Sequence, residues 1–194
     1  MKIYGDTQSG NCYKVQLVCQ LLNIDHQWID VDILAGDTKS DDFLKKNPNG
    51  KIPLLELDSG ETLSESNAII NFLAFGSDLY PNDRLAQARV LQWQFFEQYS
   101  HEPFIAVARF INKYLGLPAD KADEQTGGHK ALHVMEQQLA QTLFLTGEKV
   151  TTADISLYAY THVADEGGFE LEAYPAIRAW LDRVAALPNF RPMV

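Results

Sequence analysis

Two polar segments hold the residue types best suited to binding a peptide-like ligand. Residues 47–53 read Asn-Pro-Asn-Gly-Lys-Ile-Pro, and Glu65-Ser66 follows shortly after them. A proline has no backbone N–H, and an X-Pro bond can be cis in a tight turn. If the Ile52-Pro53 bond is cis at the entrance of a strand, the N–H and C=O of Ile52 face outward and can pair with a ligand backbone as a strand edge does.

The second segment predicts a site for both ends of an amino acid. Glu65 and Ser66 precede residues 68–73, whose apolar side chains recur at helical spacing. Ser66 is therefore expected in the first turn of a helix, where free N–H groups and the positive end of the helix dipole attract a carboxylate. The Glu65 carboxylate can hold an amine, so the two segments together suit an amino-acid-like ligand.

The composition excludes several classes of protein. The chain has 194 residues, 46% of them apolar, and a formal net charge of -10 at pH 7. Such a charge disfavours nucleic acid and anionic membranes as partners. No stretch of about 18 apolar residues is present, and polar residues interrupt the N-terminus at once, which argues against a membrane span and a signal peptide. A cytoplasmic location is the expectation.

The two cysteines, Cys12 and Cys19, are not expected to form a disulfide. On one helix they lie roughly 10 Å apart along the axis, at about 1.5 Å per residue. A disulfide requires Cα atoms within about 7 Å of each other, so an intact helix keeps the two thiols separate. Cys19 is expected to be a small buried apolar residue.

The first part of the chain alternates between strands and helices. Strands are expected at residues 2–4, 27–31 and 53–57, and a fourth strand follows the turn at 58–61 and ends at residue 63. Helices are expected at 11–22, 41–46 and about 64–74. The order βαβαββα combines a parallel crossover unit with a terminal antiparallel hairpin. We therefore expect an α/β domain over residues 1–78.

After a linker near residue 80 the chain shows only helical periods. Helices are expected at 85–115 with Pro103 inside, 129–142, from 151 or 152 past 160, and 175–186. Thr151 and Asp154 form a capping box, with Asp in the position usually held by Glu, that should start the central helix. Residues 85–194 are therefore expected to form an all-helical domain.

Three motifs in this order resemble those of the cytosolic glutathione transferases: Lys51-Ile52-Pro53, Glu65-Ser66, and Gly147 followed by residues 151–154. The resemblance covers the whole chain. It implies a thioredoxin-like N-terminal domain, a helical C-terminal domain and a homodimer. It also implies an enzyme of detoxification that conjugates glutathione, as co-substrate and with no other cofactor or metal, to a small hydrophobic electrophile.

By this resemblance, the start of the first helix meets the glutathione sulfur. A thiol is mostly protonated at neutral pH, and a hydrogen-bond donor together with a helix N-terminus lowers its pKa. Ser9 is the first candidate for the catalytic sulfur contact and Asn11 the second, as in a bacterial class that uses Ser or Thr with Asn. Cys12 is the third, through a mixed disulfide. Ser9 and Asn11 are also ordinary helix-capping residue types.

The same resemblance assigns the rest of the glutathione site. Glu65 and Ser66 hold the γ-glutamyl end, and Ile52, ahead of Pro53, pairs with the cysteinyl backbone. Lys39 or Lys51 meets the glycyl carboxylate, although either lysine is as readily a solvated surface charge.

The electrophile pocket is expected near Pro103, which should kink the long helix because it removes an internal hydrogen bond. Tyr99, Phe104 and Arg109 are the candidate lining residues. Arg109 would serve an anionic substrate or, as readily, form a salt bridge between helices or subunits.

A metal site is not expected. His129, His133 and Glu136 share one helix face, but without an HExxH pattern or a nearby cysteine a solvated face is the better interpretation.

Two alternative functions stay open. One is a glutathione-dependent disulfide reductase or peroxidase, because a Ser and Asn pair without a tyrosine suits that chemistry. The other is a non-catalytic binding or assembly protein of the same fold, against which the complete set of glutathione motifs argues.

Overall fold

The computed structural model describes residues 1–118 and 122–193, which form two compact units. The first comprises residues 1–77 with 188–194, and the second residues 78–187. This division differs from the expected domains, 1–78 and 85–194, mainly at the C-terminal tail. The hydroxyl of Tyr13 donates to the carbonyl of Arg191 at 2.8 Å, so the tail is bound to the first unit rather than to the helices that precede it.

The first unit is a four-stranded mixed sheet with helices, a thioredoxin-like arrangement. Its strands are β1 (Lys2–Gly5), β2 (Gln27–Asp30), β3 (Leu54–Glu56) and β4 (Thr62–Ser64), in the spatial order β2-β1-β3-β4. Its helices are α1 (Gly10–Leu21), α2 (Asp41–Lys46) and α3 (Ser66–Ala74), with a 3-10 turn at Asp37–Lys39. β1 and β2 are parallel and the other pairs antiparallel, which confirms the expected βαβαββα order.

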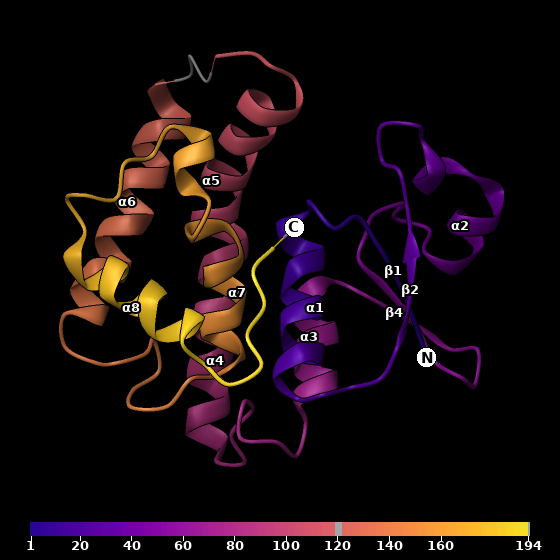
Figure 1. Cartoon of the computed structure of the whole chain (residues 1–194), viewed down its shortest axis with the longest axis horizontal. Coiled ribbons are helices and arrows are strands. Elements are labelled where there is room, and N and C mark those ends of the chain that lie inside the picture. The colour runs from indigo at the N-terminus through magenta and orange to yellow at the C-terminus, as the bar shows by residue number, and fades with distance from the viewer. Residues whose placement is uncertain (119–121, 194) are drawn as a thin grey trace. The chain divides into compact units, whose positions relative to one another are not determined.

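The register of the sheet brings the functional segments to one end of it. Tyr4 pairs with Leu54, and Leu54 pairs with Ser64. The end of β1, the start of β3 and the end of β4 therefore coincide. Figure 1 shows α1 and α3 packed side by side on one face of this sheet. Since both helices follow strands that end here, both begin at this end as well.

The second unit is helical throughout. It contains α4 (Arg84–Phe96), α5 (Glu102–Arg109), α6 (Ala122–Leu139), α7 (Thr152–Thr161) and α8 (Pro175–Ala185), with a 3-10 turn at Ala164–Gly167. Two π-helical segments, Glu97–His101 and Phe110–Tyr114, follow α4 and α5. The first ends at His101, two residues before Pro103. Because a proline ring excludes one hydrogen bond of a regular helix, the interruption expected at Pro103 takes the form of this π segment.

Helix α6 begins earlier than residue 129, where the sequence pattern placed its start. Gly127 and Gly128 are poor helix formers and hid the first turns of the helix. Both glycines have a packing role, because a Cβ there would lie 2.2 Å from the ring of Phe104 or 2.4 Å from the ring of Phe169.

Helix α7 is the centre of the second unit, and every one of its residues is buried. The expected capping box is confirmed: the Asp154 carboxylate accepts from Thr151 N at 2.8 Å, and also from Leu145 N and Trp180 Nε1 at 2.9 and 3.0 Å. Burial raises the pKa of Asp154 to about 6, although these donors oppose the shift. The capping box thus has a structural role: it stabilises the start of α7, and its Asp154 also binds the indole N–H of Trp180.

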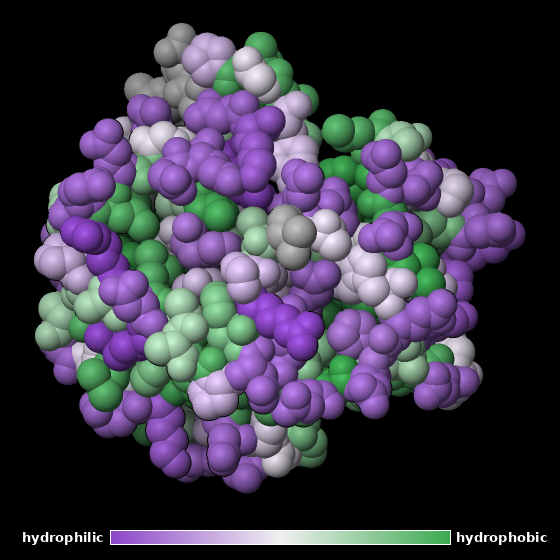
Figure 2. Space-filling model, in the orientation of Figure 1, coloured by the Kyte–Doolittle hydropathy of each residue, from purple (hydrophilic) through white to green (hydrophobic). Residues whose placement is uncertain are grey.

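The visible surface of the molecule is mostly hydrophilic. Figure 2 shows hydrophilic side chains over most of the visible face, with smaller apolar areas between them. No helix in the described ranges combines the length and apolar character needed to cross a bilayer.

Candidate functional site

The Ile52-Pro53 peptide bond is cis, which is the condition that the sequence analysis set for an outward-facing Ile52 backbone. It lies immediately before β3, at the sheet end where β1 and β4 finish. Within the described part of the chain, neither the N–H nor the C=O of Ile52 has a hydrogen-bond partner. The structure thus leaves this backbone pair available to an extended ligand.

Glu65 lies across from Pro53 at the same end of the sheet, since Leu54 pairs with Ser64 one residue inward. Its φ of 68° is in the left-handed region, which is uncommon outside glycine. Strained backbone of this kind clusters at ligand sites. The side chain is exposed, and among the described residues its carboxylate makes no hydrogen bond or ion pair.

Ser9 is the N-cap of α1, and its Oγ accepts a hydrogen bond from Cys12 N at 3.4 Å. Because the oxygen is the acceptor in this contact, the hydroxyl proton of Ser9 is left to donate elsewhere. Ser9 is half-buried at the first turn of α1, whose dipole favours a negative charge nearby.

Cys12 differs from Ser9 in access. Its side chain is fully buried, and burial raises the pKa of the thiol to about 12. The thiolate is the reactive form, so this position is poorly suited to a mixed disulfide at neutral pH. Cys19 is also buried, as expected of a small apolar residue.

Asn11 and Ser66 are brought together by the packing of α1 on α3. The Ser66 hydroxyl donates to Asn11 Oδ1 at 3.1 Å, and Lys14 Nζ donates to the same oxygen at 2.8 Å. Lys14 Nζ also lies 3.3 Å from Ser66 Oγ. Sequence reasoning missed Lys14. Its signal is a lysine one turn after Asn11, placed between the buried-type residues Tyr13 and Val15.

The two candidate lysines are exposed and differ in their contacts. Lys39 Nζ donates to the Gly50 carbonyl at 3.1 Å, which places a positive charge beside residues 51–53. Lys51 has its carbonyl held at 2.7 Å by the buried side chain of Asn47. Asn47 therefore shapes the loop that carries the cis bond, a role the sequence did not reveal.

Two of the three candidate electrophile residues line the same cavity, and the third does not. Tyr99 and Phe104 line one cavity of about 420 Å³, together with Phe96, Lys130 and Val134. Arg109 is not part of its lining.

Arg109 is only 3% exposed, and its Nε donates to Glu166 at 2.5 Å. Lys113 binds the same carboxylate at 2.6 Å. Arg109 thus takes part in a salt bridge, the second role that the sequence left open, and its place in the electrophile pocket stays a prediction.

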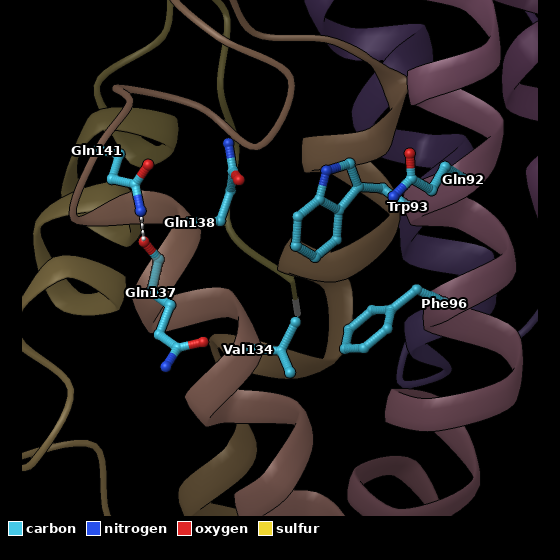
Figure 3. Close-up of a pocket in the computed structure, with 7 residues that line it drawn as sticks. All are labelled: Gln92, Trp93, Phe96, Val134, Gln137, Gln138 and Gln141. Atoms are coloured by element: carbon cyan, nitrogen blue, oxygen red, sulfur yellow. Dashed lines mark hydrogen bonds between the residues drawn. The ribbon is translucent and has the colours of Figure 1, made fainter.

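A second cavity, of about 350 Å³, lies between α4 and α6. Figure 3 shows Trp93 and Phe96 of α4 pointing towards Val134 and Gln138 of α6. The remaining lining residues are glutamines 92, 137 and 141. None of these side chains titrates near neutral pH or acts as a nucleophile, so this cavity is not a centre of thiol chemistry.

The three side chains on the α6 face considered as a metal site all contact other groups of the protein. His129 Nδ1 lies 3.0 Å from Tyr174 Oη, and His133 Nε2 lies 3.0 Å from Gln137 Nε2. Glu136 accepts from two backbone N–H groups of α8. Over residues 1–118 and 122–193, no group of three or more His, Cys, Asp or Glu side chains is arranged to hold a metal.

Comparison with known proteins gives matches to two family models. Residues 8–74 match the N-terminal domain of glutathione S-transferases, and residues 100–188 match the C-terminal domain. Glutathione S-transferase 3 of Zea mays is 32% identical over 100% of this chain and 93% of its own length. A crystal structure of a glutathione S-transferase from Pseudomonas fluorescens is 57% identical, with a TM-score of 0.97 over 100% of this chain and 98% of that one.

A further relative is named a disulfide-bond oxidoreductase, YfcG of Escherichia coli. It is 28% identical over 92% of this chain and 87% of its own length. The two domain matches, the thioredoxin-like first unit with its cis-proline, and the helical second unit all agree. The chain therefore belongs to the cytosolic glutathione S-transferase superfamily, as an enzyme of the glutathione transferase type.

Proposed function

We propose that glutathione binds at the end of the sheet where residues 52–53, Glu65 and the first turns of α1 and α3 meet. The observation that carries this proposal is the contact between Asn11 and Ser66, which joins the start of α1 to the start of α3. The γ-glutamyl carboxylate lies against the first-turn N–H groups of α3, and the amine lies against Glu65. The cysteinyl backbone pairs with Ile52.

The sulfur of glutathione then reaches the start of α1. Lys14 Nζ and Ser66 Oγ both donate to Asn11 Oδ1, so the amide oxygen faces these two donors and the Nδ2 group of Asn11 faces the opposite way. This amide and the Ser9 hydroxyl donate to the sulfur and favour its thiolate. The thiol proton leaves to solvent, and the thiolate attacks an electrophilic carbon, forming the C–S bond as the leaving group departs.

The electrophile is hydrophobic in this proposal. The cavity lined by Tyr99 and Phe104 is mainly aromatic and aliphatic, and Lys130 is its charged lining residue. Apolar walls with few polar groups are typical of sites for hydrophobic small molecules.

Calorimetric titration with reduced and then oxidised glutathione tests the binding site. Ser66→Ala should weaken binding about tenfold, because it removes the hydroxyl that holds Asn11 and the α3 start together. Ser59→Ala, on an exposed hairpin, should leave binding unchanged. Absence of binding in the unmodified chain would reject the site, and equal binding by Ser66→Ala would reject its placement.

A disulfide reductase is the second candidate function, and the similarity to the oxidoreductase YfcG favours it. The same titration separates the two, since a reductase should bind oxidised glutathione more tightly and reduce a mixed disulfide faster than it conjugates an electrophile.

A homodimer and a cytoplasmic location complete the proposal. Leu91 and Phe95 of α4 and Tyr99 of the π segment that follows it lie four residues apart, and they are 37%, 68% and 85% exposed. Residues four apart are neighbours on a helix surface, so these three side chains form an apolar surface, the exposed α4 face, that is suited to a second copy.

A further inference from the structure

Lys14 is a charged residue with no exposed surface, although it lies near the start of a helix. Its ammonium group donates at 2.8 Å to Asn11 Oδ1 and at 3.3 Å to Ser66 Oγ. Because Ser66 Oγ is itself 3.1 Å from Asn11 Oδ1, the three side chains form a closed triangle. The triangle joins one helix to another that begins more than 50 residues later in the chain.

The three groups of the triangle differ in what they can accept. An amide has an oxygen that accepts and a nitrogen that donates, while a hydroxyl does either. Ser66 therefore satisfies Asn11 in both orientations of the amide, as a donor to Oδ1 or as an acceptor from Nδ2. An ammonium group only donates. With Lys14 in place, an inward Nδ2 would set two donors against each other, so the oxygen must face inward.

We infer that Lys14 is a positioning residue, which holds the Asn11 amide with its oxygen towards the interior and its Nδ2 donor towards the glutathione sulfur. This inference rests on the proposed function, since it assigns the inward face of the group that contacts the sulfur there. Lys14 acts through Asn11 and does not itself touch the thiol.

The reversed amide would be harmful to the reaction. It would present Oδ1 to the sulfur, and an oxygen lone pair repels a thiolate where an N–H stabilises it. A side chain at position 14 that both donates and accepts would permit this reversal. Lys14→Gln is such a change, while Lys14→Arg keeps a side chain that only donates.

The experiment titrates the thiol of bound glutathione by its thiolate absorbance and follows the pH profile of conjugation. Lys14→Gln should raise the pKa of the bound thiol and lower kcat at neutral pH about tenfold. The reason is that the Asn11 amide would be reversed in part of the molecules, which would then lack the Nδ2 donor to the sulfur. Lys14→Arg should leave both near the values of the unmodified enzyme. Circular dichroism and thermal melting establish that each variant is folded.

A second comparison separates positioning from a direct effect of charge. In an Asn11→Leu background there is no amide to orient, so Lys14→Gln should cause no further rise in the pKa of the thiol. A rise of the same size in that background would overturn the inference in favour of a charge effect through space. No rise with Lys14→Gln alone would also overturn it.

One measurement does not depend on the variants folding or on glutathione binding. Nuclear magnetic resonance of the unmodified protein should show the Asn11 side-chain amide protons remote from the Lys14 ε-methylene protons. A close contact between them would overturn the inference while leaving the proposed function intact. Conversely, a failure to bind glutathione would reject the proposed function and leave the orientation of the amide to be read from the same spectrum.

Discussion

A serine and a cysteine, Ser9 and Cys12, lie within one turn of each other at the start of α1, and either could contact a sulfur atom. Ser9 is half-buried at the cap, and Cys12 is fully buried beneath it. The difference arises from helix geometry, because positions three apart share a helix face but the cap lies at its open end. The hydroxyl thus keeps access to a ligand while the thiol packs into the core.

Cys12 should therefore be unreactive in the folded protein. Its buried thiol, with a pKa raised to about 12, holds almost no thiolate at neutral pH. Incubation with iodoacetamide at neutral pH should label neither cysteine of the native protein, and both after denaturation, as read by peptide mass spectrometry. Rapid native labelling of Cys12, or its isolation as a glutathione mixed disulfide, would restore it as a catalytic candidate.

Glu56 should make the first unit sensitive to acid. Its carboxylate contacts Lys46, Tyr4 and Lys2, and these hydrogen bonds, with that of Lys46 the strongest, lower its pKa to about 2. A carboxylate with a lowered pKa in the folded state stabilises the protein above its unfolded pKa. That stability is lost as the pH falls from about 4.5 towards 2.

Denaturant unfolding at a series of pH values measures this contribution. Glu56→Gln should lower the free energy of unfolding at neutral pH and flatten its decline below about pH 4.5. Glu61→Gln, on the exposed hairpin, is the matched control. If the free energy of unfolding of Glu56→Gln declines below about pH 4.5 as steeply as that of the unmodified protein, other carboxylates cause the acid sensitivity.

At the scale of elements, α8 depends on a side chain from another helix. Pro175 occupies its first turn, and no side-chain cap is present at Tyr174. The Glu136 carboxylate of α6 accepts from the N–H groups of Ala176 and Ile177, each at 2.9 Å. These contacts satisfy two donors that the helix itself leaves open.

Glu136→Gln should destabilise the protein by about 1–2 kcal/mol. The glutamine amide has one oxygen that can still accept from α8, but its NH2 group would face the second backbone N–H, and two donors cannot bond to each other. The free energy of unfolding in urea measures the effect. Glu172→Gln makes the same chemical change at an exposed position, and equal effects of the two substitutions would contradict the capping role.

At the scale of the whole molecule, the exposed α4 face predicts self-association. Phe95 lies at its centre between Leu91 and Tyr99, so Phe95→Glu places a charge where apolar contact with a second copy is expected. The unmodified protein should be dimeric by light scattering and Phe95→Glu monomeric, with its melting temperature measured alongside. Leu34→Glu adds the same charge at an exposed apolar residue of the first unit. A dimer that survives Phe95→Glu would place the interface elsewhere.

The sequence predicted most elements because their signals are local. Period-two and helical patterns, the turn at residues 58–61 and the Thr151 capping box all lie within short windows. Prediction was poorer where packing overrides propensity. The glycines of α6 hid its first turns because they make room for two phenylalanine rings, and nothing local marked the second π segment, Phe110–Tyr114.

The sequence by itself determined the fold class, the Lys51-Ile52-Pro53 motif and the family, because these depend on local spacing and motif order. Only the tertiary structure decided that Lys14 and Ser66, 52 positions apart, meet at Asn11. It likewise decided that Cys12 is buried and that Arg109 binds Glu166, 57 positions further along. The physical reason is that burial and hydrogen-bond partners depend on which helix faces pack together, and that information is spread over distant segments of the chain.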